Sequence, residues 1–389
     1  MLFRKNLREY PFHFLVLYAL IYMTNAVYGT FIPVYLDSIG YGQIAIGSLL
    51  AVGPFVSILA QPVWGTLGDR ARSKNDILKI LIFGSAVTVL MHRLSENYYY
   101  LLFIMAAFTF FQTSISPISD TITLESLDRS SWKFGPIRMA GTLGYALMAV
   151  IAGAYAKSSI NGIFFLYFCI AIAAFLVTYR LPTVRGHQTK EQKVPARRLF
   201  KNKKLVVLMA FGMVLQITLG FYYSFYSLYL KQMGANNSLL GWAMFLSAIS
   251  EVPFLIFADR ILKKLGTEYT LLGSALAMGL RWFILYKTTD PYFALMSQLL
   301  HGINFIVLQY SMATYINETV PKELKAIGQT INTLFGVGIS RIIGSFFGGF
   351  LSERFGIQSV FLYGSLLAFS AVFVFSFWLM KQRNVKNDC

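Results

Sequence analysis

The chain has 389 residues, of which 56% are hydrophobic and only 13% are charged. A soluble globular domain carries about 25% charged residues, so the composition excludes a soluble enzyme, a disulfide scaffold and a coiled coil. The net charge of +17 does not indicate nucleic-acid binding, because Lys and Arg lie between apolar segments and not on a face with stacking aromatics. The composition is typical of a polytopic helical membrane protein.

Apolar segments of 18 or more residues are long enough to cross a bilayer. Read against turn and charge signals, they predict an all-α membrane protein with twelve transmembrane helices. In chain order these helices lie at 12–35, 43–67, 76–94, 98–124, 136–156, 160–180, 205–230, 238–261, 268–287, 291–317, 326–350 and 357–380. The longest polar interruption, 181–204, predicts a central linker between two six-helix halves, 1–180 and 205–389.

The distribution of Lys and Arg predicts the orientation. With the N-terminus inside, 26 of the 34 Lys and Arg residues fall on the cytoplasmic side, five fall outside and three lie within helices. The positive-inside rule therefore places both termini in the cytoplasm, and we expect a bacterial plasma-membrane protein. No nucleotide-binding motif is present, so ATP-driven pumping is not expected. We also expect no cofactor and no metal.

The two halves echo each other in sequence. Residues 141–167 align with 336–362 at a shift of 195, which superposes Ala149 and Gly153 on Gly344 and Gly348. Small residues four apart allow helices to approach closely in lipid. Tight packing alone explains each pair, but its recurrence in both halves favours a duplicated transporter architecture.

A second echo follows the second and eighth predicted helices. Residues 65–74 read GTLGDRARSK, and Asp259-Arg260 is followed by two lysines. A carboxylate at a helix end can pair with basic groups in one conformation and release them in another. We therefore interpret Gly65, Asp69 and Arg70, with the Asp259-Arg260 pair, as a conformational latch, and a charged loop is the alternative. The first stretch resembles the loop signature of the major facilitator superfamily, which implies the twelve-helix fold over the whole chain.

Ionisable side chains within a bilayer cost at least about 2.5–3.5 kcal/mol each and therefore face protein or water. Three acids and three arginines could compensate one another in pairs, with Glu251 expected as the partner of Arg341. Either structural ion pairs or a transport site would account for them. The seven candidates are Asp120, Glu125, Arg138, Glu251, Arg281, His301 and Arg341.

The strongest local pattern spans the predicted fourth and fifth helices. A short turn joins them, so Asp120 and Arg138 can face each other, and Tyr145 lies two turns beyond Arg138. A carboxylate, a guanidinium and an aromatic face together can bind a polyhydroxylated ring. The amides of Asn25 and Gln216 also need partners inside a membrane, so we add them as candidate substrate-binding residues.

The stretch 120–145 resembles the oligosaccharide:proton symporter branch, which includes lactose permease. That resemblance implies sugar binding by Asp120, Arg138 and Tyr145, although the branch carries a longer acid and a tryptophan at two of these positions. It also links Arg281 and His301 to proton coupling.

The chain departs from that branch at two positions. Asn304 and Gln298 stand where the branch has a proton-accepting glutamate and a lysine. Glu251 is therefore our candidate for the proton carrier. The segments 241–254 and 320–328 resemble instead phenylpropionate-permease-like relatives.

These patterns lead to three readings of function. The first is a monomeric proton-coupled symporter for a small polar organic solute (a sugar, a nucleoside or an aromatic acid), embedded in the lipid bilayer, with a proton or another cation as the coupling ion. The second is an efflux antiporter of amphipathic compounds, which the 35 Phe and 14 Met residues would suit. The third is a membrane sensor that keeps the fold without transport.

Overall fold

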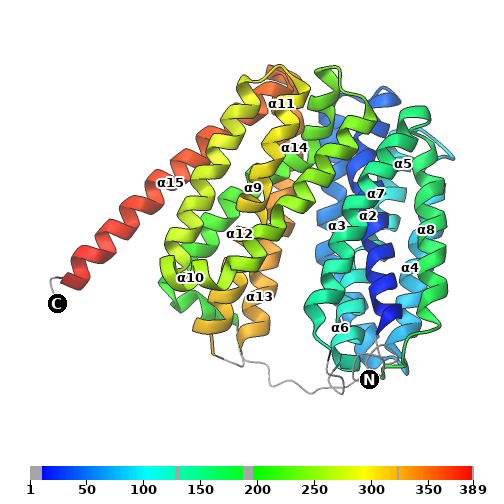
Figure 1. Ribbon diagram of the computed structural model, residues 1–389, viewed down its shortest axis with the longest axis horizontal. Coiled ribbons are helices and arrows are strands. Elements are labelled where there is room, and N and C mark those ends of the chain that lie inside the picture. Colours follow the sequence, from blue (N-terminus) through cyan, green and yellow to red (C-terminus); the bar gives the residue numbers. More distant parts are fainter. Residues whose placement is uncertain (1–10, 128–131, 187–195, 322–323, 388–389) are drawn as a thin grey trace, which may run out of the picture. The chain divides into compact units, whose positions relative to one another are not determined.

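The computed structural model describes residues 11–127, 132–186, 196–321 and 324–387. All regular structure within these ranges is helical, as predicted (Figure 1). The N-terminal half contains α2 (Phe12–Ser38), α3 (Gln43–Arg70), α4 (Lys74–Met91), α5 (Tyr98–Gln112), α6 (Ile115–Leu127), α7 (Phe134–Ser158) and α8 (Gly162–Thr178). The C-terminal half contains η1 (Ala196–Lys201), α9 (Lys203–Gln232), α10 (Asn237–Lys287), α11 (Pro291–Met296), η2 (Ser297–Leu300), α12 (His301–Thr319), α13 (Lys325–Thr333), η4 (Leu334–Ile339), α14 (Ser340–Phe355) and α15 (Ile357–Asn387).

Nine helices of the described part of the chain are long and apolar enough to cross a membrane, and α8 is a shorter apolar helix. One of the nine, α10, holds the predicted helices 238–261 and 268–287 in a single element. Its backbone breaks at Gly266, where φ is 77°, a conformation that glycine adopts at little cost. The predicted helix 98–124 is divided instead, because α5 ends at Gln112 and α6 begins at Ile115.

Several helices begin at a side chain that accepts a hydrogen bond from the first turn. Asn97 accepts from the N–H groups of Tyr99 and Tyr100, and Asn202 accepts from that of Leu205. Asn236 and Asp290 cap α10 and α11 in the same way. Such caps satisfy backbone donors that no helical carbonyl can reach and contribute typically about 1 kcal/mol each.

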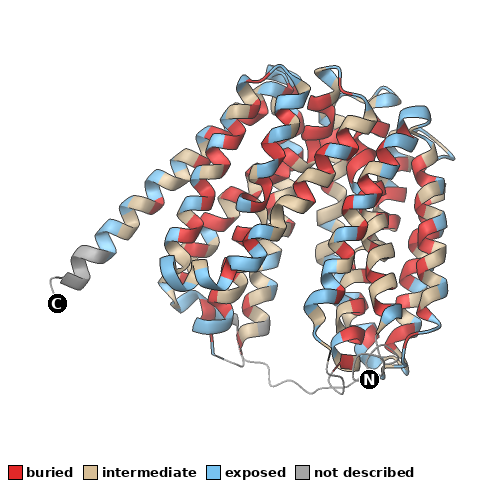
Figure 2. Cartoon of the chain, viewed as in Figure 1, coloured by how far each residue is buried: buried red, intermediate tan, exposed pale blue. Residues whose placement is uncertain are grey.

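Large apolar side chains remain exposed along the helices. Phe103 is 68% exposed, Leu176 60% and Phe373 75%, and Figure 2 shows exposed residues spread along the helices as well as at their ends. A soluble monomer rarely exposes so much apolar surface. Because helices satisfy their own backbone hydrogen bonds, these surfaces suit lipid.

The helices group into two compact units. Unit 1 comprises Met1–Tyr35 and Val56–Lys190, and unit 2 comprises Leu36–Phe55 and Glu191–Cys389. The predicted close packing of small residues is confirmed in unit 2. A Cβ at Gly344 of α14 would lie 2.5 Å from the carbonyl oxygen of Ile217 in α9, and a Cβ at Gly348 would lie 2.8 Å from the Phe225 ring.

The segment after α8 is hydrogen-bonded to the connection between α3 and α4. The Asn75 side chain donates to the Pro182 carbonyl at 3.1 Å and accepts from the Val184 N–H at 3.0 Å. The backbone N–H of Lys74 donates to Val184, and that of Gly186 donates to Ala71. Residues 182–186 are therefore fixed to unit 1, and we call these four hydrogen bonds the Asn75 clamp.

Candidate functional site

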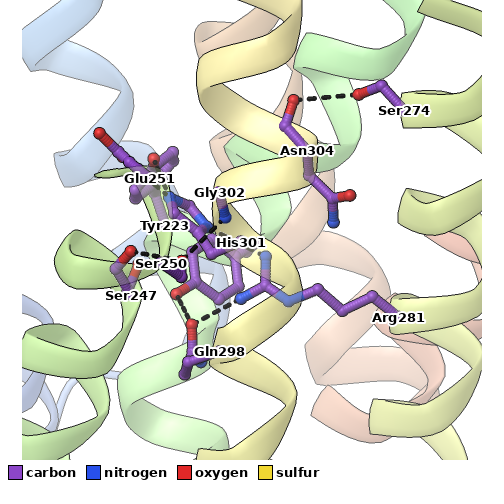
Figure 3. Close-up of polar contacts among 11 residues, drawn as sticks. Tyr223, Ser247, Ser250, Glu251, Ser274, Arg281, Gln298, His301, Gly302 and Asn304 are labelled. Atoms are coloured by element: carbon purple, nitrogen blue, oxygen red, sulfur yellow. Dashed lines mark hydrogen bonds and ion pairs between the residues drawn. The ribbon is translucent and has the colours of Figure 1, made fainter. Parts of the chain in front are cut away.

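Three of the predicted residues meet in unit 2. His301 begins α12, and its Nε2 lies 3.8 Å from the Glu251 carboxylate of α10. The other ring nitrogen, Nδ1, lies 3.0 Å from a guanidinium nitrogen of Arg281, also from α10. Figure 3 shows Glu251 and Arg281 approaching His301 from opposite sides. The structure thus brings together the three residues that we expected to act in proton coupling.

Hydrogen bonding determines which nitrogen of His301 carries the proton. A guanidinium only donates hydrogen bonds, so the Nδ1 of His301 must accept from Arg281. The ring proton therefore resides on Nε2, which faces the Glu251 carboxylate and lies 3.3 Å from the Tyr223 hydroxyl. A second proton on Nδ1 would displace Arg281, so this contact keeps the imidazole neutral.

Arg281 is 0% exposed and makes several polar and aromatic contacts. It donates to the side-chain oxygen of Gln298 at 2.6 Å, and that oxygen also accepts from the Tyr222 hydroxyl at 2.7 Å. Its guanidinium lies 4.6 Å from the centre of the Tyr222 ring and 5.0 Å from that of Trp282. Within the described part of the chain Arg281 forms no ion pair with a carboxylate, and its Nε has no hydrogen-bond partner.

A close approach of α10 and α12 places Glu251 beside His301. The Gly302 N–H donates to the Ser250 hydroxyl at 2.9 Å. A Cβ at Gly302 would lie 1.9 Å from the Ser250 carbonyl oxygen. Only glycine allows this distance. The contact therefore holds Glu251, which follows Ser250, beside His301, which precedes Gly302.

We expect Gly302→Ala to destabilise the protein by about 1–3 kcal/mol or more, because the backbone of α10 cannot yield to the added methyl group. The apparent melting temperature of purified protein measures the loss. Gly273→Ala is the matched control, since a Cβ there meets nothing within 4 Å and should stabilise α10 by about 0.5–1 kcal/mol. Equal melting temperatures for the two variants would contradict the close contact.

Arg341 extends the cluster from α14. Its guanidinium carbon lies 4.5 Å from the centre of the Tyr223 ring. The expected ion pair with Glu251 is wrong, because Arg341 forms no ion pair among the residues that the structure describes, and its Nε is shielded from solvent without a hydrogen-bond partner. Sequence reasoning could not show how α14 is rotated.

The predicted binding residues of unit 1 contact tyrosines of α2. The Asp120 carboxylate accepts a hydrogen bond of 2.5 Å from the Tyr18 hydroxyl. The Arg138 guanidinium lies 4.6 Å from the centre of the Tyr22 ring. Tyr22 follows Tyr18 by one turn of α2. Gly141 makes room for that ring, since a Cβ there would lie 2.8 Å from it. Tyr18 was not among the predicted residues, although its spacing of four from Tyr22 places both side chains on the same face of α2.

The remaining substrate-binding candidates have different surroundings. The Tyr145 hydroxyl lies 3.5 Å from that of Thr30, and the Asn25 side-chain oxygen accepts from Gln112 at 2.7 Å. Gln216 of α9 is 3% exposed, and its side-chain oxygen has no partner among the described residues. Both side-chain atoms of Asn304 are buried without a partner in the same part of the chain. A buried amide atom without a partner is costly, and a polar ligand group would offset that cost at Gln216 or Asn304.

Latch residues and Glu125 lie near helix ends. Gly65, Asp69 and Arg70 occupy the last turns of α3, and Asp259 accepts from the Tyr310 hydroxyl at 2.6 Å. Arg260 lies 5.9 Å from the Phe257 ring centre. Glu125 forms an ion pair of 2.5 Å with Lys74 at the start of α4. Among the described residues no group of three His, Cys, Asp or Glu side chains could hold a metal ion.

Comparison with known proteins places the chain in a family. The profile described as the MFS_1 like family matches residues 10–363. The chain belongs to this family of the major facilitator superfamily. This transporter is therefore a multi-pass membrane protein, not an enzyme, and its expected fold is confirmed.

The proteins that it resembles are named for different solutes. The maltose permease of Geobacillus stearothermophilus is 25% identical over 352 residues, which cover 88% of each chain. A probable 3-phenylpropionic acid transporter of Escherichia coli (strain K12) is 22% identical over 89% of this chain and 93% of its own. The crystal structure of the nucleoside transporter NupG matches with a TM-score of 0.83 and 19% identity, over 94% of this chain and 98% of that chain. This structural likeness shows the fold alone.

Proposed function

We propose that this transporter carries a small polar organic solute into the cell together with a proton, by alternating access. The observation that supports the proposal most is the chain of contacts from Glu251 through His301 to Arg281 inside membrane-spanning helices. Ionisable groups at that depth are expensive and mark ion or proton pathways in many transporters. These three side chains can gain or lose a proton without unfolding the helices around them.

Glu251 is the proton carrier in this proposal. Its carboxylate attracts the Nε2–H of His301, and this attraction weakens when the carboxyl group is protonated. Arg281 holds His301 in the tautomer that presents this proton. Binding or release of a proton at Glu251 therefore changes the hydrogen bonding of the whole cluster.

The proposal assigns solute binding to five of the predicted residues. Asp120 and Arg138 offer a charged acceptor and a forked donor, and Tyr145 offers an aromatic face. Asn25 and Gln216 add amide groups. The buried, unpartnered oxygen of Gln216 supports this assignment, because a ligand donor would satisfy it.

Alternating access requires the halves 1–180 and 205–389 to move relative to each other while the linker 181–204 keeps them joined. We assign Gly65, Asp69, Arg70, Asp259 and Arg260 to a latch that releases during this change. The hydrogen bond from Tyr310 to Asp259 supports a role at the second motif. We further propose that the protein is a monomer with both termini in the cytoplasm.

Proteoliposomes that contain a pH-sensitive dye test the proposal. We expect one of maltose, uridine or 3-phenylpropionate to acidify the lumen as it enters, and an inward proton gradient to concentrate that solute. The concentration ratio at steady state and the dye signal are the measurements. Solute export against the gradient would indicate an efflux antiporter instead, and binding without flux would indicate a sensor.

A further inference from the structure

We propose that Arg341, together with Arg281, binds a carboxylate group of the transported solute. The inference rests on the proposed function and names its substrate class, a small organic monocarboxylate. Arg341 lies in a membrane-spanning helix, yet it forms no ion pair among the described residues. An unpaired charge in such a place is costly unless a ligand compensates it.

One edge of the Arg341 guanidinium lacks a hydrogen-bond partner at its Nε. A guanidinium has five N–H donors and two faces. The Tyr223 ring covers one face at 4.5 Å, but an aromatic ring satisfies no donor in the plane. The Nε of Arg341 is buried without a partner, and so is the Nε of Arg281. A planar carboxylate fits such an edge with two parallel hydrogen bonds.

Backbone packing fixes where this group lies. A Cβ at Gly220 of α9 would lie 3.2 Å from the Cα of Arg341 and 3.1 Å from that of Gly344. Tyr223 follows Gly220 by one turn, so the ring and the arginine that it supports are held by the same helix contact. The π-helical turn Leu334–Ile339 directly precedes this region, and such turns occur frequently at functional sites.

The charges of unit 2 favour an anion. Of the ionisable residues that we predicted inside helices, unit 2 holds two arginines, one carboxyl group and His301, which Arg281 keeps neutral. The excess is one positive charge when Glu251 is ionised and two when Glu251 is protonated. A monocarboxylate is therefore attracted more strongly after a proton has bound.

This dependence couples the two ligands. If protonation of Glu251 strengthens anion binding, the bound anion must strengthen protonation by the same factor. Proton and carboxylate then load together and move no net charge. Uptake should depend on the pH gradient and not on the membrane potential, whereas proton symport of a neutral solute would respond to both.

Matched pairs of ligands test the carboxylate assignment on the full-length protein. In thermal-shift measurements we expect 3-phenylpropionate or D-glucuronate to raise the melting temperature, and the corresponding 3-phenylpropionamide or D-glucose to have at least tenfold weaker effects. Arg341→Gln should abolish the response to the acid. Arg354→Gln is the matched control, since it removes an exposed arginine from the same helix and should keep the response.

The stability of the ligand-free variant separates binding from a structural role. Removing an uncompensated charge should raise the melting temperature of Arg341→Gln by roughly 2–4 °C. A fall in melting temperature with an unchanged acid response would overturn the inference. If both the stability and the response fall, Arg341→Lys must restore part of the response, and its failure to do so would also overturn the inference.

The remaining outcomes distinguish this inference from the proposed function. Proton-linked, potential-driven uptake of maltose or uridine without any response to the acids would overturn the carboxylate assignment and leave symport intact. A response to glucose 6-phosphate alone would overturn it as well. Silence from every acid and every neutral solute, in binding and in transport, would reject both proposals.

Discussion

Glu251→Gln is expected to abolish proton-driven accumulation of the solute while leaving exchange of solute across the membrane intact. The amide keeps the size of the side chain but cannot bind and release a proton. A pH difference of one unit corresponds to 1.36 kcal/mol, enough for about tenfold accumulation with one proton per solute. In the variant this ratio should fall to about one.

Parallel assays in proteoliposomes check this expectation. Accumulation is measured with an imposed pH gradient, and exchange is measured with solute at equal concentration on both sides. Glu318→Gln is a suitable control, because it removes an exposed carboxylate near the end of α12. Full accumulation by Glu251→Gln would place the proton carrier elsewhere.

Asp120→Asn should weaken solute binding about ten- to a hundredfold. A hydrogen bond to a charged group contributes about 1.5–3 kcal/mol, and an amide replaces one accepting oxygen with a donor. The variant also loses the charged partner of the Tyr18 hydroxyl, which now lies 2.5 Å from the carboxylate. The dissociation constant of the solute that the proteoliposome panel identifies is the measurement.

Two further variants make this test specific. Tyr18→Phe keeps the carboxylate and removes its present partner, so binding should change less than in Asp120→Asn. Asp76→Asn alters an exposed carboxylate that pairs with Lys79, and it should leave affinity unchanged. Unaltered affinity in Asp120→Asn would refute the assignment of this residue to the solute site.

The helices could be predicted from sequence because lipid leaves few alternatives. A backbone in a bilayer must satisfy its own hydrogen bonds, so each long apolar run had to be a helix. The break between the eighth and ninth helices was predicted as well, because the charged residues between 259 and 264 interrupt the apolar pattern there. The sequence did not show that this break needs no loop, since α10 is helical on both sides of Gly266, whose φ is 77°.

Pairings between helices were less predictable than the helices themselves. Asp120 and Arg138 were predicted to be able to face each other, whereas the contacts of Asp120 with Tyr18 and of Arg138 with Tyr22 were not predicted. The rotation of each helix about its axis decides such contacts, and apolar residues on all sides give no signal for that rotation. Glu251, Arg281 and His301 meet because glycine at 302 lets two backbones touch, which a pattern of residue types cannot show.

The Asn75 clamp has a practical consequence for engineering this transporter. Because Asn75 binds both Pro182 and Val184, the chain as far as Gly186 is part of the N-terminal unit. A cut or an insertion before Pro182 would separate residues 182–186 from the rest of that unit and expose the four hydrogen bonds of the clamp to water. Co-expressed fragments, or a fluorescent domain placed between the halves, therefore belong after Gly186.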